Sequence, residues 1–373
     1  MADGGVKPHA LVVGAGIAGL ASALALRRVG WSIEVIERAP ALAPLGAALN
    51  LWPNAVAALD RLGVSARIAT QGTPVTRLML DADGAVLLDQ PVAGTAFLVT
   101  RAVLQQILLD ALDQPVSFGI EASGIDAAEH GRIVLASGER RAADLVVVAD
   151  GIRSHIGRQV TRTAPAYAGY AGVVALSDSI AGPGLDGVAR EHWRGNERFG
   201  LFDLGEGRRY WFHMRRARES TPGLDHHAIA ARAAAWPEAV GAAVAATPAE
   251  RLIAWPIGAR AAPSCLAAGR LVCVGDAGHA MQPNLGQGAC QALEDAVALG
   301  IAAERVAPDR VGALFEAMRL RRVRSVVRRS AEGGWAAHGP GPVRAALRAG
   351  LRLTPAAVQA RMLAGMHGMP AYE

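Results

Sequence analysis

A short apolar run and three closely spaced glycines near the start of this chain constrain its fold more than any other feature. The run covers Ala10 to Val13, and Gly14, Gly16 and Gly19 follow it in a G-x-G-x-x-G pattern. In such a pattern Gly14 permits a tight turn, Gly16 lets backbone approach a pyrophosphate, and Gly19 lets a helix pack closely on a strand. We therefore predict a strand, a turn and a helix whose first N–H groups bind phosphate.

A second predicted strand, Ile33 to Ile36, ends in an acidic residue, Glu37. An acid at this place in a dinucleotide-binding unit accepts hydrogen bonds from the adenosine ribose, and its charge repels a 2′-phosphate. The bound dinucleotide is therefore expected to be FAD or NAD. Strand, glycines, helix, strand and acid occur together in one unit, which makes the pattern specific. The site predicted here consists of Gly14, Gly16, Ile17, Ala18, Gly19, Glu37 and Arg38.

Another glycine-rich turn lies in the C-terminal half of the chain. The apolar residues Leu271 to Val274 predict a strand, and the segment PNLGQG precedes a predicted helix that starts near Gln287. Asp276 at the strand end can accept hydrogen bonds from sugar-like hydroxyls, and the amides that open the helix can hold an anion. Two such turns would hold the two ends of one long cofactor. The cofactor residues predicted here are Gly275, Asp276, Gly286, Gln287 and Gly288.

The basic residues of the chain exclude several kinds of chemistry. Lys7 is the only lysine in 373 residues, so no lysine in the folded body can form a Schiff base or complete a Walker A loop. Arginine cannot replace it, because arginine does not lose its proton in proteins. The net charge is +5, but the arginines are scattered and no nucleic-acid-binding signature is present, so we expect no nucleic-acid partner. The densest arginine run, 319–329, has valines at helical spacing and predicts a solvated helix face.

Three cysteines, Cys265, Cys273 and Cys290, show no metal-ligand spacing and predict small buried side chains in a reducing compartment. We therefore expect no metal site. The first apolar run is the nucleotide-binding strand itself rather than a secretion signal, and no uncharged apolar run reaches ~18 residues. These features favour a cytoplasmic enzyme that has no membrane segment. The choice between a monomer and a homodimer stays open.

The two turns together resemble the FAD-dependent aromatic hydroxylases, the single-component flavoprotein monooxygenases that include para-hydroxybenzoate, salicylate and urate hydroxylases. The segment GDAGHAMQPNLGQGACQALEDA is similar to their GD motif, which contacts the flavin ribityl chain. ADLVVVADGIRSHIGRQV, residues 143–160, resembles their DG motif, which contributes to FAD and NAD(P)H binding. GAALNLWPNAVAALDRLG and TRAVLQQILLDAL resemble two further family segments. The resemblance adds Arg101, Asp150, Gly151 and Arg153 to the expected FAD site.

The resemblance also implies an α/β fold. It would combine a glutathione-reductase-like FAD-binding Rossmann domain, an inserted mixed β-sheet domain for the substrate, and a C-terminal helical segment. The expected FAD-binding domain is discontinuous and covers residues 1–72, 97–163 and 262–330. Residues 73–96 and 164–261 would form the substrate domain, and residues 331–373 the C-terminal helices, which we expect to serve packing or an interface.

The middle of the chain alternates short strand-like runs with turn residues, as expected of a substrate-binding sheet. LFDLGEGRRYWFHM predicts a hairpin around the Gly205–Gly207 turn. Arg198 and Tyr210 on its two strands resemble an arginine–tyrosine pair that urate hydroxylases use at the substrate. Tyrosine can orient or deprotonate a phenol, and arginine can stabilise the resulting anion.

Further residues are expected near the substrate. Pro283 would face the reactive side of the flavin, His213 is a weaker candidate for a base, and His279 would support its own loop. The apolar residues that could line one wall of the pocket are Trp193, Phe199, Leu201, Tyr210, Phe212, Met214 and Trp255.

The resemblance implies a monooxygenase that holds FAD tightly and non-covalently, with NADPH or NADH as a transient co-substrate. Reduced flavin would react with O2 to give a C4a-hydroperoxide, and an electron-rich aromatic or enolic small molecule would take up one oxygen atom. The cofactor would carry out this chemistry, while the protein would position the substrate, exclude water from the flavin and control access to it. Heavy use of alanine and arginine with almost no lysine indicates a GC-rich bacterial genome, in which such enzymes serve aromatic breakdown and secondary metabolism.

Several alternatives stay open at this point. A flavoenzyme of the same fold could be an epoxidase, a Baeyer–Villiger-type oxygenase or a reductase. An NAD-dependent dehydrogenase would explain the first turn but not the DG and GD segments. A non-catalytic flavin-binding protein would keep the turns without turnover. The residues specify neither the substrate nor the choice between NADH and NADPH.

Overall fold

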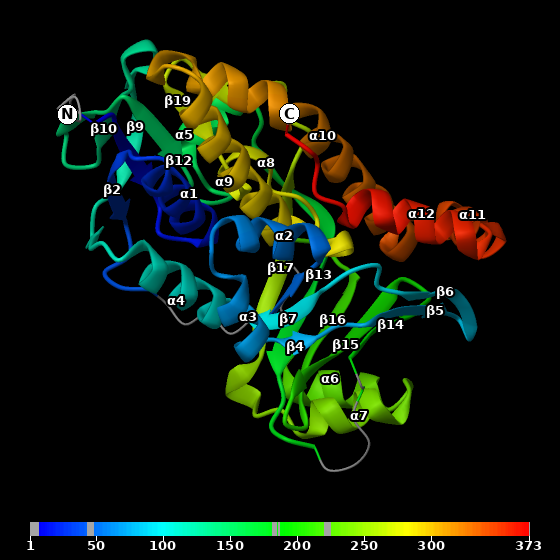
Figure 1. Cartoon of the computed structure of the whole chain (residues 1–373). Coiled ribbons are helices and arrows are strands. Elements are labelled where there is room, and N and C mark those ends of the chain that lie inside the picture. The colour runs from blue at the N-terminus through cyan, green and yellow to red at the C-terminus, as the bar shows by residue number, and fades with distance from the viewer. Residues whose placement is uncertain (1–6, 43–47, 181–184, 186, 220–224, 373) are drawn as a thin grey trace.

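The structure of the chain is a computed structural model that describes residues 7–372 apart from 43–47, 181–184, 186 and 220–224. The described strands form four sheets, and the largest have six and seven strands. Figure 1 shows these two large sheets in different halves of the molecule. A long helix, α10 (Val311–His338), contacts strands of both.

The six-stranded sheet has the order β18-β19-β12-β1-β2-β8. Its strands are β1 His9–Val13, β2 Ser32–Glu37, β8 Val116–Phe118, β12 Leu145–Val148, β18 Ala267–Ala268 and β19 Leu271–Cys273. β1, β12 and β19 are parallel neighbours, although they come from distant parts of the chain. These three strands are short apolar runs buried almost throughout, as parallel strands between two covered faces require.

Different layers cover the two faces of this sheet. Ala10 and Val12 belong to the core shared with α1 and α9, while Leu11 and Val13 pack with α5 and a small sheet. The strand, turn and helix predicted at each glycine-rich turn are confirmed, as β1 with α1 and as β19 with α9. The helices around the sheet are α1 Ile17–Arg28, α2 Pro53–Arg61, α3 Ser65–Gln71, α4 Arg101–Leu112, α5 His155–Thr161, α8 Asp276–His279 and α9 Gly288–Arg305.

Two three-stranded sheets complete this part of the molecule. One has the order β11-β10-β9 and the other β3-β7-β4. The first consists of β9 Ala122–Ala127, β10 Arg132–Leu135 and β11 Arg140–Ala142, and the second of β3 Ala48–Leu51, β4 Thr73–Pro74 and β7 Phe97–Thr100. The short 3-10 helices are η1 Ala128–His130, η2 Ala249–Arg251, η3 Pro283–Leu285 and η4 Pro308–Arg310.

The seven-stranded sheet has the order β17-β13-β16-β15-β14-β5-β6. β14 and β5 are parallel and the other neighbours are antiparallel, so the sheet is mixed, as expected. The predicted hairpin is confirmed as β15 and β16. The strands are β5 Arg77–Ala82, β6 Ala85–Pro91, β13 Pro165–Leu176, β14 Val188–Arg194, β15 Glu197–Gly205, β16 Arg208–Arg216 and β17 Ile253–Arg260, and the helices α6 His226–Ala233 and α7 Glu238–Ala245 lie against them.

The two faces of the seven-stranded sheet pack on different parts of the molecule. Phe199 and Leu201 pack with α6 and α7, which lie at the bottom of Figure 1. Tyr210 and Phe212 belong instead to the large core that includes α1 and α9. Phe199 and Leu201 therefore cannot share one pocket wall with Tyr210 and Phe212, because side chains alternate between the two faces along a strand.

The strands β5 and β6 come from an early part of the chain and extend the sheet made by β13 to β17. This pairing supports the expected grouping of residues 73–96 with residues 164–261. β4, at the start of the first range, pairs with β7 in the smaller sheet instead. The domain boundaries themselves stay a prediction.

The C-terminal helical segment is present as expected. It comprises the end of α10, then α11 (Gly341–Leu353) and α12 (Ala356–His367), which lie beside β6 in Figure 1. The predicted solvated face of the arginine run is wrong for Arg319, which is fully buried against α9, where two carboxylates pair with it. Within the described residues, no helix is both long enough and apolar enough to cross a lipid bilayer.

Candidate functional site

At the first glycine-rich turn the backbone itself requires glycine. Gly14 has a φ of 106°, and a Cβ at this position would lie 2.6 Å from the carbonyl oxygen of Ala149. A Cβ at Gly19 would lie 1.9 Å from the Gly14 carbonyl oxygen, so α1 begins close against β1. Gly16 is the N-cap of α1 and has open space beside it. The turn therefore leaves room for an anionic ligand at the positive end of α1.

Backbone amides hold Glu37 beside this turn. Its Oε2 accepts a hydrogen bond from the Ala15 N–H at 2.8 Å, and its Oε1 accepts one from the Ala39 N–H at 3.0 Å. The Ala15 carbonyl oxygen accepts from Gln105 Nε2 of α4 at 2.8 Å. The structure thus places Glu37 and the first part of α4 against the same turn.

The second glycine-rich turn lies directly beside the first. Gly275 has a φ of 55°, and a Cβ there would lie 2.7 Å from the Cβ of Ala18 on α1. Asp276 follows as the first residue of α8 and is exposed, while the rest of α8 is buried. The helices α1 and α9 also pack against each other. Two turns that are far apart in the sequence therefore form one site, with Asp276 at its surface.

Trp52 fixes the loop before α9. Its Nε1 donates to the carbonyl oxygen of Leu285 at 3.2 Å, and a Cβ at Gly286 would lie 2.9 Å from the same nitrogen. The side chain of Gln287 is buried, and its Oε1 accepts from Asn54 Nδ2 at 2.9 Å. Gln287 therefore holds the loop with its side chain and offers only its backbone N–H to a ligand.

The segment predicted to resemble the DG motif contributes an acid with one unpaired carboxylate oxygen. Asp150 Oδ1 is buried without a hydrogen-bond partner among the described residues, and burial raises the pKa of this carboxyl although Ser154 and, more weakly, Arg38 oppose the shift. Gly151 has a φ of 83° and open space beside it. Arg38, Arg101 and Arg153 are all exposed. Because buried polar atoms are normally paired, the free oxygen of Asp150 indicates a ligand with a hydrogen-bond donor.

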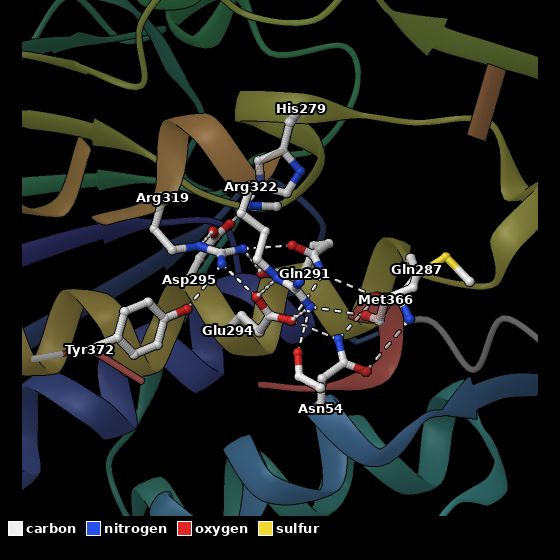
Figure 2. A network of polar contacts seen from close by, with 12 residues as sticks. Asn54, His279, Gln287, Gln291, Glu294, Asp295, Arg319, Arg322, Met366 and Tyr372 are labelled. Carbon is white, nitrogen blue, oxygen red and sulfur yellow. Dashed lines mark hydrogen bonds and ion pairs between the residues drawn. The ribbon is translucent and has the colours of Figure 1, made fainter. Parts of the chain in front are cut away.

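A buried polar network lies beneath the second turn (Figure 2). Arg319 of α10 donates from Nε to Asp295 Oδ1 at 2.7 Å and from Nη1 to Glu294 Oε2 at 2.5 Å. Asp295 Oδ2 accepts from the Gly275 N–H at 2.9 Å and lies 2.6 Å from His279 Nε2. The network therefore ties α10 and α9 to the turn at Gly275.

Glu294 extends the network to the loop before α9. Its Oε1 accepts from Asn54 Nδ2 at 2.7 Å, and Asn54 also holds Gln287. Burial alone would raise the pKa of Glu294, but Arg319 and Arg322 outweigh it and hold this pKa below its usual range. Glu294 therefore stays ionised and keeps accepting hydrogen bonds in the protein interior.

The predicted substrate pair lies on the sheet face that belongs to the large core. The register of β15 and β16 puts Arg198 and Tyr210 on this same face. Arg198 is only 2% exposed, its Nη1 donates to Glu191 Oε2 at 3.3 Å, and its guanidinium carbon lies 5.1 Å from the centre of the Phe212 ring. Tyr210 is buried, which raises its pKa well above the usual range. The two side chains share a face, and Arg198 is held there by an ion pair.

The loop that carries Pro283 is fixed by β13 and α10. The Tyr170 hydroxyl of β13 lies within hydrogen-bond distance of Gln282 Oε1, at 3.1 Å, and of Asn284 Oδ1, at 3.2 Å. Asn284 Nδ2 donates to the carbonyl oxygen of Ser330 on α10 at 2.8 Å. The loop at the second turn is thereby joined to the seven-stranded sheet.

The two histidines considered from the sequence lie in different places. His213 is fully buried on the face covered by α6 and α7, and its Nε2 lies 3.0 Å from Glu197 Oε2. That face is opposite the one that carries Tyr210, so His213 does not join the candidate substrate site. His279 contacts Asp295 in the buried network and thereby supports the turn at Gly275.

Several residues that shape the site were not predicted. The signal for Glu294 and Asp295 was an acid pair inside the largely apolar helix pattern ACQALEDAVALG, because charges on a buried helix face need buried partners. No local signal identifies Glu191, which pairs with the predicted arginine. The same holds for Arg260, whose Nη2 donates to the carbonyl oxygen of Ile152 at 2.7 Å and fixes the segment after β12.

The described residues fit FAD. Gly16, Gly151 and Gly288 each have open space, where an added Cβ would meet nothing within 4 Å. Two helix N-termini, those of α1 and α9, offer N–H groups to an anionic cofactor at adjoining turns. The exposed Asp276 and the unpaired oxygen of Asp150 provide acceptors for hydroxyl or N–H donors.

Comparisons with known proteins agree with this geometry. The family described as "FAD binding domain" matches residues 7–330. Aurachin C monooxygenase/isomerase from Stigmatella aurantiaca is 33% identical over 334 residues, which cover 85% of this chain and 86% of the relative. 3-Amino-4-hydroxybenzoate 2-monooxygenase from Streptomyces cremeus is 34% identical over 336 residues, which cover 86% and 85%.

A solved structure supports the same assignment. The crystal structure of Klebsiella pneumoniae HpxO complexed with FAD and uric acid superimposes with a TM-score of 0.85 and 27% identity, and the match covers 96% of each chain. Together these matches confirm the expected fold, FAD as the cofactor and the class of FAD-dependent monooxygenases. The chain is therefore a member of the FAD binding domain family.

Proposed function

We propose that this FAD-dependent monooxygenase uses NADPH or NADH and O2 to hydroxylate an electron-rich aromatic or enolic small molecule. The observation that carries the proposal is the junction of the two glycine-rich turns, where Gly275 of one lies against Ala18 of the other. One long dinucleotide can extend across this junction, from the N-terminus of α1 to the N-terminus of α9. The similarity to enzymes named for 3-amino-4-hydroxybenzoate and urate supports a small ring compound as the substrate.

Each part of the site has a role toward FAD. The amides of the Gly14–Gly19 turn would bind the pyrophosphate, and Asp276 would accept from ribityl hydroxyls. Glu37 already accepts hydrogen bonds from two backbone N–H groups, and its remaining lone pairs could accept hydrogen bonds from the adenosine ribose. The amides of Gly286–Gly288 would face the flavin ring. When bound, FAD accepts electrons from NAD(P)H and activates O2 for transfer of one oxygen atom to the substrate.

The substrate side is proposed to consist of Arg198, Tyr210 and Pro283. Because burial raises the pKa of Tyr210, its hydroxyl keeps its proton and orients a substrate by donating a hydrogen bond rather than by acting as a base. Arg198 would stabilise negative charge that develops on the substrate, and Glu191 holds it in place for this role. Pro283 would lie beside the flavin, on the loop joined to Tyr170 of β13.

The state of the three cysteines indicates the kind of cellular compartment in which the protein works. Cys265, Cys273 and Cys290 are all free thiols, and burial raises the pKa of Cys290 to about 12. Free thiols, two of them fully buried, favour a reducing compartment such as the cytoplasm.

The test begins with the visible spectrum of the purified protein. Flavin bands should bleach with NADPH or NADH and return in air, faster when an aromatic substrate is present. Coupled measurement of NAD(P)H oxidation and O2 uptake should then show equal consumption that substrate stimulates. NAD(P)H oxidation without O2 uptake would argue for a reductase. Absence of flavin bands after incubation with FAD would favour the dehydrogenase alternative.

A further inference from the structure

We call the last described residues of the chain, 365–372, the C-terminal tail. This tail packs against the buried network below the candidate FAD site. Arg322 of α10 donates from Nη2 to the carbonyl oxygen of Met366 at 3.0 Å. The Tyr372 hydroxyl accepts from Arg319 Nη1 at 3.0 Å. Figure 2 shows both tail residues beside the buried network. The tail is therefore bound to the same network that supports the second turn.

His367 connects the tail to Trp52. Their ring centroids lie 4.7 Å apart with an interplanar angle of 9°, so the two rings stack. Both side chains are buried. The Trp52 Nε1 in turn donates to the Leu285 carbonyl oxygen at 3.2 Å. The indole therefore contacts the tail with its ring and holds residues 285–288, which we call the flavin loop, with its N–H.

An ionic route joins the same two parts. Arg322, which binds the tail, donates from Nε and Nη2 to the two carboxylate oxygens of Glu294, at 2.7 Å each. Glu294 Oε1 also accepts from Asn54 Nδ2 at 2.7 Å, and Asn54 holds Gln287 of the flavin loop at 2.9 Å. Two separate chains of contacts, one aromatic and one ionic, thus run from the C-terminal tail to the flavin loop.

We propose that the C-terminal tail is a clamp for the flavin loop, with His367 as its positioning residue. The inference rests on the proposed function, in which the amides of Gly286–Gly288 face FAD. With the tail in place, Trp52 and the flavin loop are ordered before FAD binds, and preorganised groups bind more tightly than groups that binding must order. Burial and, to a lesser extent, Arg322 lower the pKa of His367 to about 4, so the stack contains a neutral ring at pH 7.

The test measures the FAD Kd and the visible flavin spectrum of the full chain with His367→Ala. Loss of one stacked ring is expected to raise the Kd by about 2- to 10-fold. The flavin absorption bands should shift, because the loop amides no longer meet the ring in one geometry. His367→Phe keeps a ring on Trp52 and should restore both readouts. Met362→Ala, on the same helix and 55% exposed, is the matched control and should change neither.

The possible outcomes separate the clamp from the function on which it rests. Failure of the wild-type chain to bind FAD would overturn both. If the wild type binds FAD and His367→Ala has the same Kd and spectrum, only the clamp is overturned. A lower melting temperature of the His367→Ala apoprotein with an unchanged FAD Kd also overturns it, because that result indicates a purely structural role.

A second variant tests the contact between Trp52 and the flavin loop, and it can be used if His367→Ala does not fold. Trp52→Phe keeps a ring against His367 but removes the N–H that holds Leu285. The clamp predicts a shifted flavin spectrum and a raised FAD Kd for this variant. An unchanged spectrum and Kd would overturn the proposal.

Discussion

Gly14 and Gly16 lie two positions apart in the first turn, and their surroundings differ sharply. A Cβ at Gly14 would lie 2.6 Å from the Ala149 carbonyl oxygen at a φ of 106°, whereas a Cβ at Gly16 would meet nothing within 4 Å. Gly14 therefore serves the fold and Gly16 leaves space for a ligand. The spacing of the motif already assigns these roles, although the residue that a side chain at Gly14 would meet, Ala149, is distant in sequence.

Alanine at these two positions should have opposite effects. Gly14→Ala is expected to lower the free energy of unfolding of the apoprotein by about 1–3 kcal/mol, since it introduces strain and a backbone clash. Gly16→Ala should leave that free energy nearly unchanged and weaken FAD binding, because its methyl group occupies the space open to the pyrophosphate. Urea unfolding and FAD titration measure the two effects. A Gly16→Ala protein with wild-type FAD affinity would contradict the assignment of that space.

Asp276 should matter for the cofactor and not for the fold, because it is exposed. Asp276→Ala is expected to raise the FAD Kd by about 10-fold or more, as removal of a charged hydrogen-bond acceptor does. The apoprotein should unfold within about 0.5 kcal/mol of wild type. Asp309→Ala, an exposed acid beyond the other end of α9, is the control for fluorescence titration. A fully flavinated and fully active Asp276→Ala enzyme would remove this residue from the site.

Other residues of the site could not be predicted from the sequence. Trp52 and Leu285 are 233 positions apart, and Arg319 and Asp295 are 24 apart on different helices. Such contacts depend on how whole elements pack, which the local pattern does not specify. Glu37, in contrast, follows the strand that the motif itself requires. The predicted residues are thus those that belong to a recognisable local motif, even where, as at Gly14, the nearest neighbour in space is distant in sequence.

At the scale of elements, the packing of α9 on α10 explains why Arg319 is buried, against the prediction of a solvated arginine face. α9 carries Glu294 and Asp295, together with Gln291, on a buried and largely apolar face. Charges in that position need a buried partner, so the facing helix has to supply a cation. Arg319 supplies it, while Arg321 of the same run is exposed. The valines at helical spacing indicated the buried face correctly, but not that an arginine shares it.

Removal of this cation should destabilise the protein strongly. Arg319→Met removes an ion-pair partner from two buried carboxylates and is expected to lower the free energy of unfolding by about 3–5 kcal/mol. Arg321→Met, two positions along the same helix and exposed, should change it by less than about 0.5 kcal/mol. Urea unfolding of the apoproteins gives both values. Similar losses in the two variants would show that the ion pairs do not support the α9–α10 contact.

At the scale of the whole molecule, burial affects several histidines. The pKa values of His192, His213, His338 and His367 all lie below 6.5, and burial is the main cause in each case. The pKa of His338 is lowered to about 3 and that of His367 to about 4. In the unfolded chain these histidines bind protons as the pH falls below about 6.5, whereas in the folded chain they stay neutral to a lower pH. The resulting stability is therefore present above about pH 6.5 and is lost as the pH falls toward 4.

This shift predicts a pH profile. Between pH 7 and pH 5 the free energy of unfolding should fall by about 2 kcal/mol for each of His338 and His367. His338→Gln should flatten the profile by about that amount, and His130→Gln, on the surface, should leave it as in wild type. Urea unfolding at several pH values provides the measurement. A wild-type stability that is constant over this interval would contradict the prediction.

The sequence predicts the FAD-binding sheet, but it does not predict where the C-terminal tail packs. Buried apolar strands that end in glycine-rich turns predict the FAD-binding sheet, because each unit is local. The return of the C-terminal tail was not predictable. Arg322 binds the tail through the backbone carbonyl of Met366, and every residue type offers such a carbonyl.

The six-stranded sheet joins strands that are far apart along the chain, since Val13 pairs with Val148 and Val148 with Cys273. Folding slows as the sequence separation of contacting residues grows, and closing long loops costs entropy before any contact forms. The chain should therefore fold slowly. During synthesis β1 can pair with β2 early, but its other edge should stay unpaired until β12 is made, and the free edge of β12 until β19 is made. An apolar segment of the nascent protein would then be available to chaperones throughout that interval.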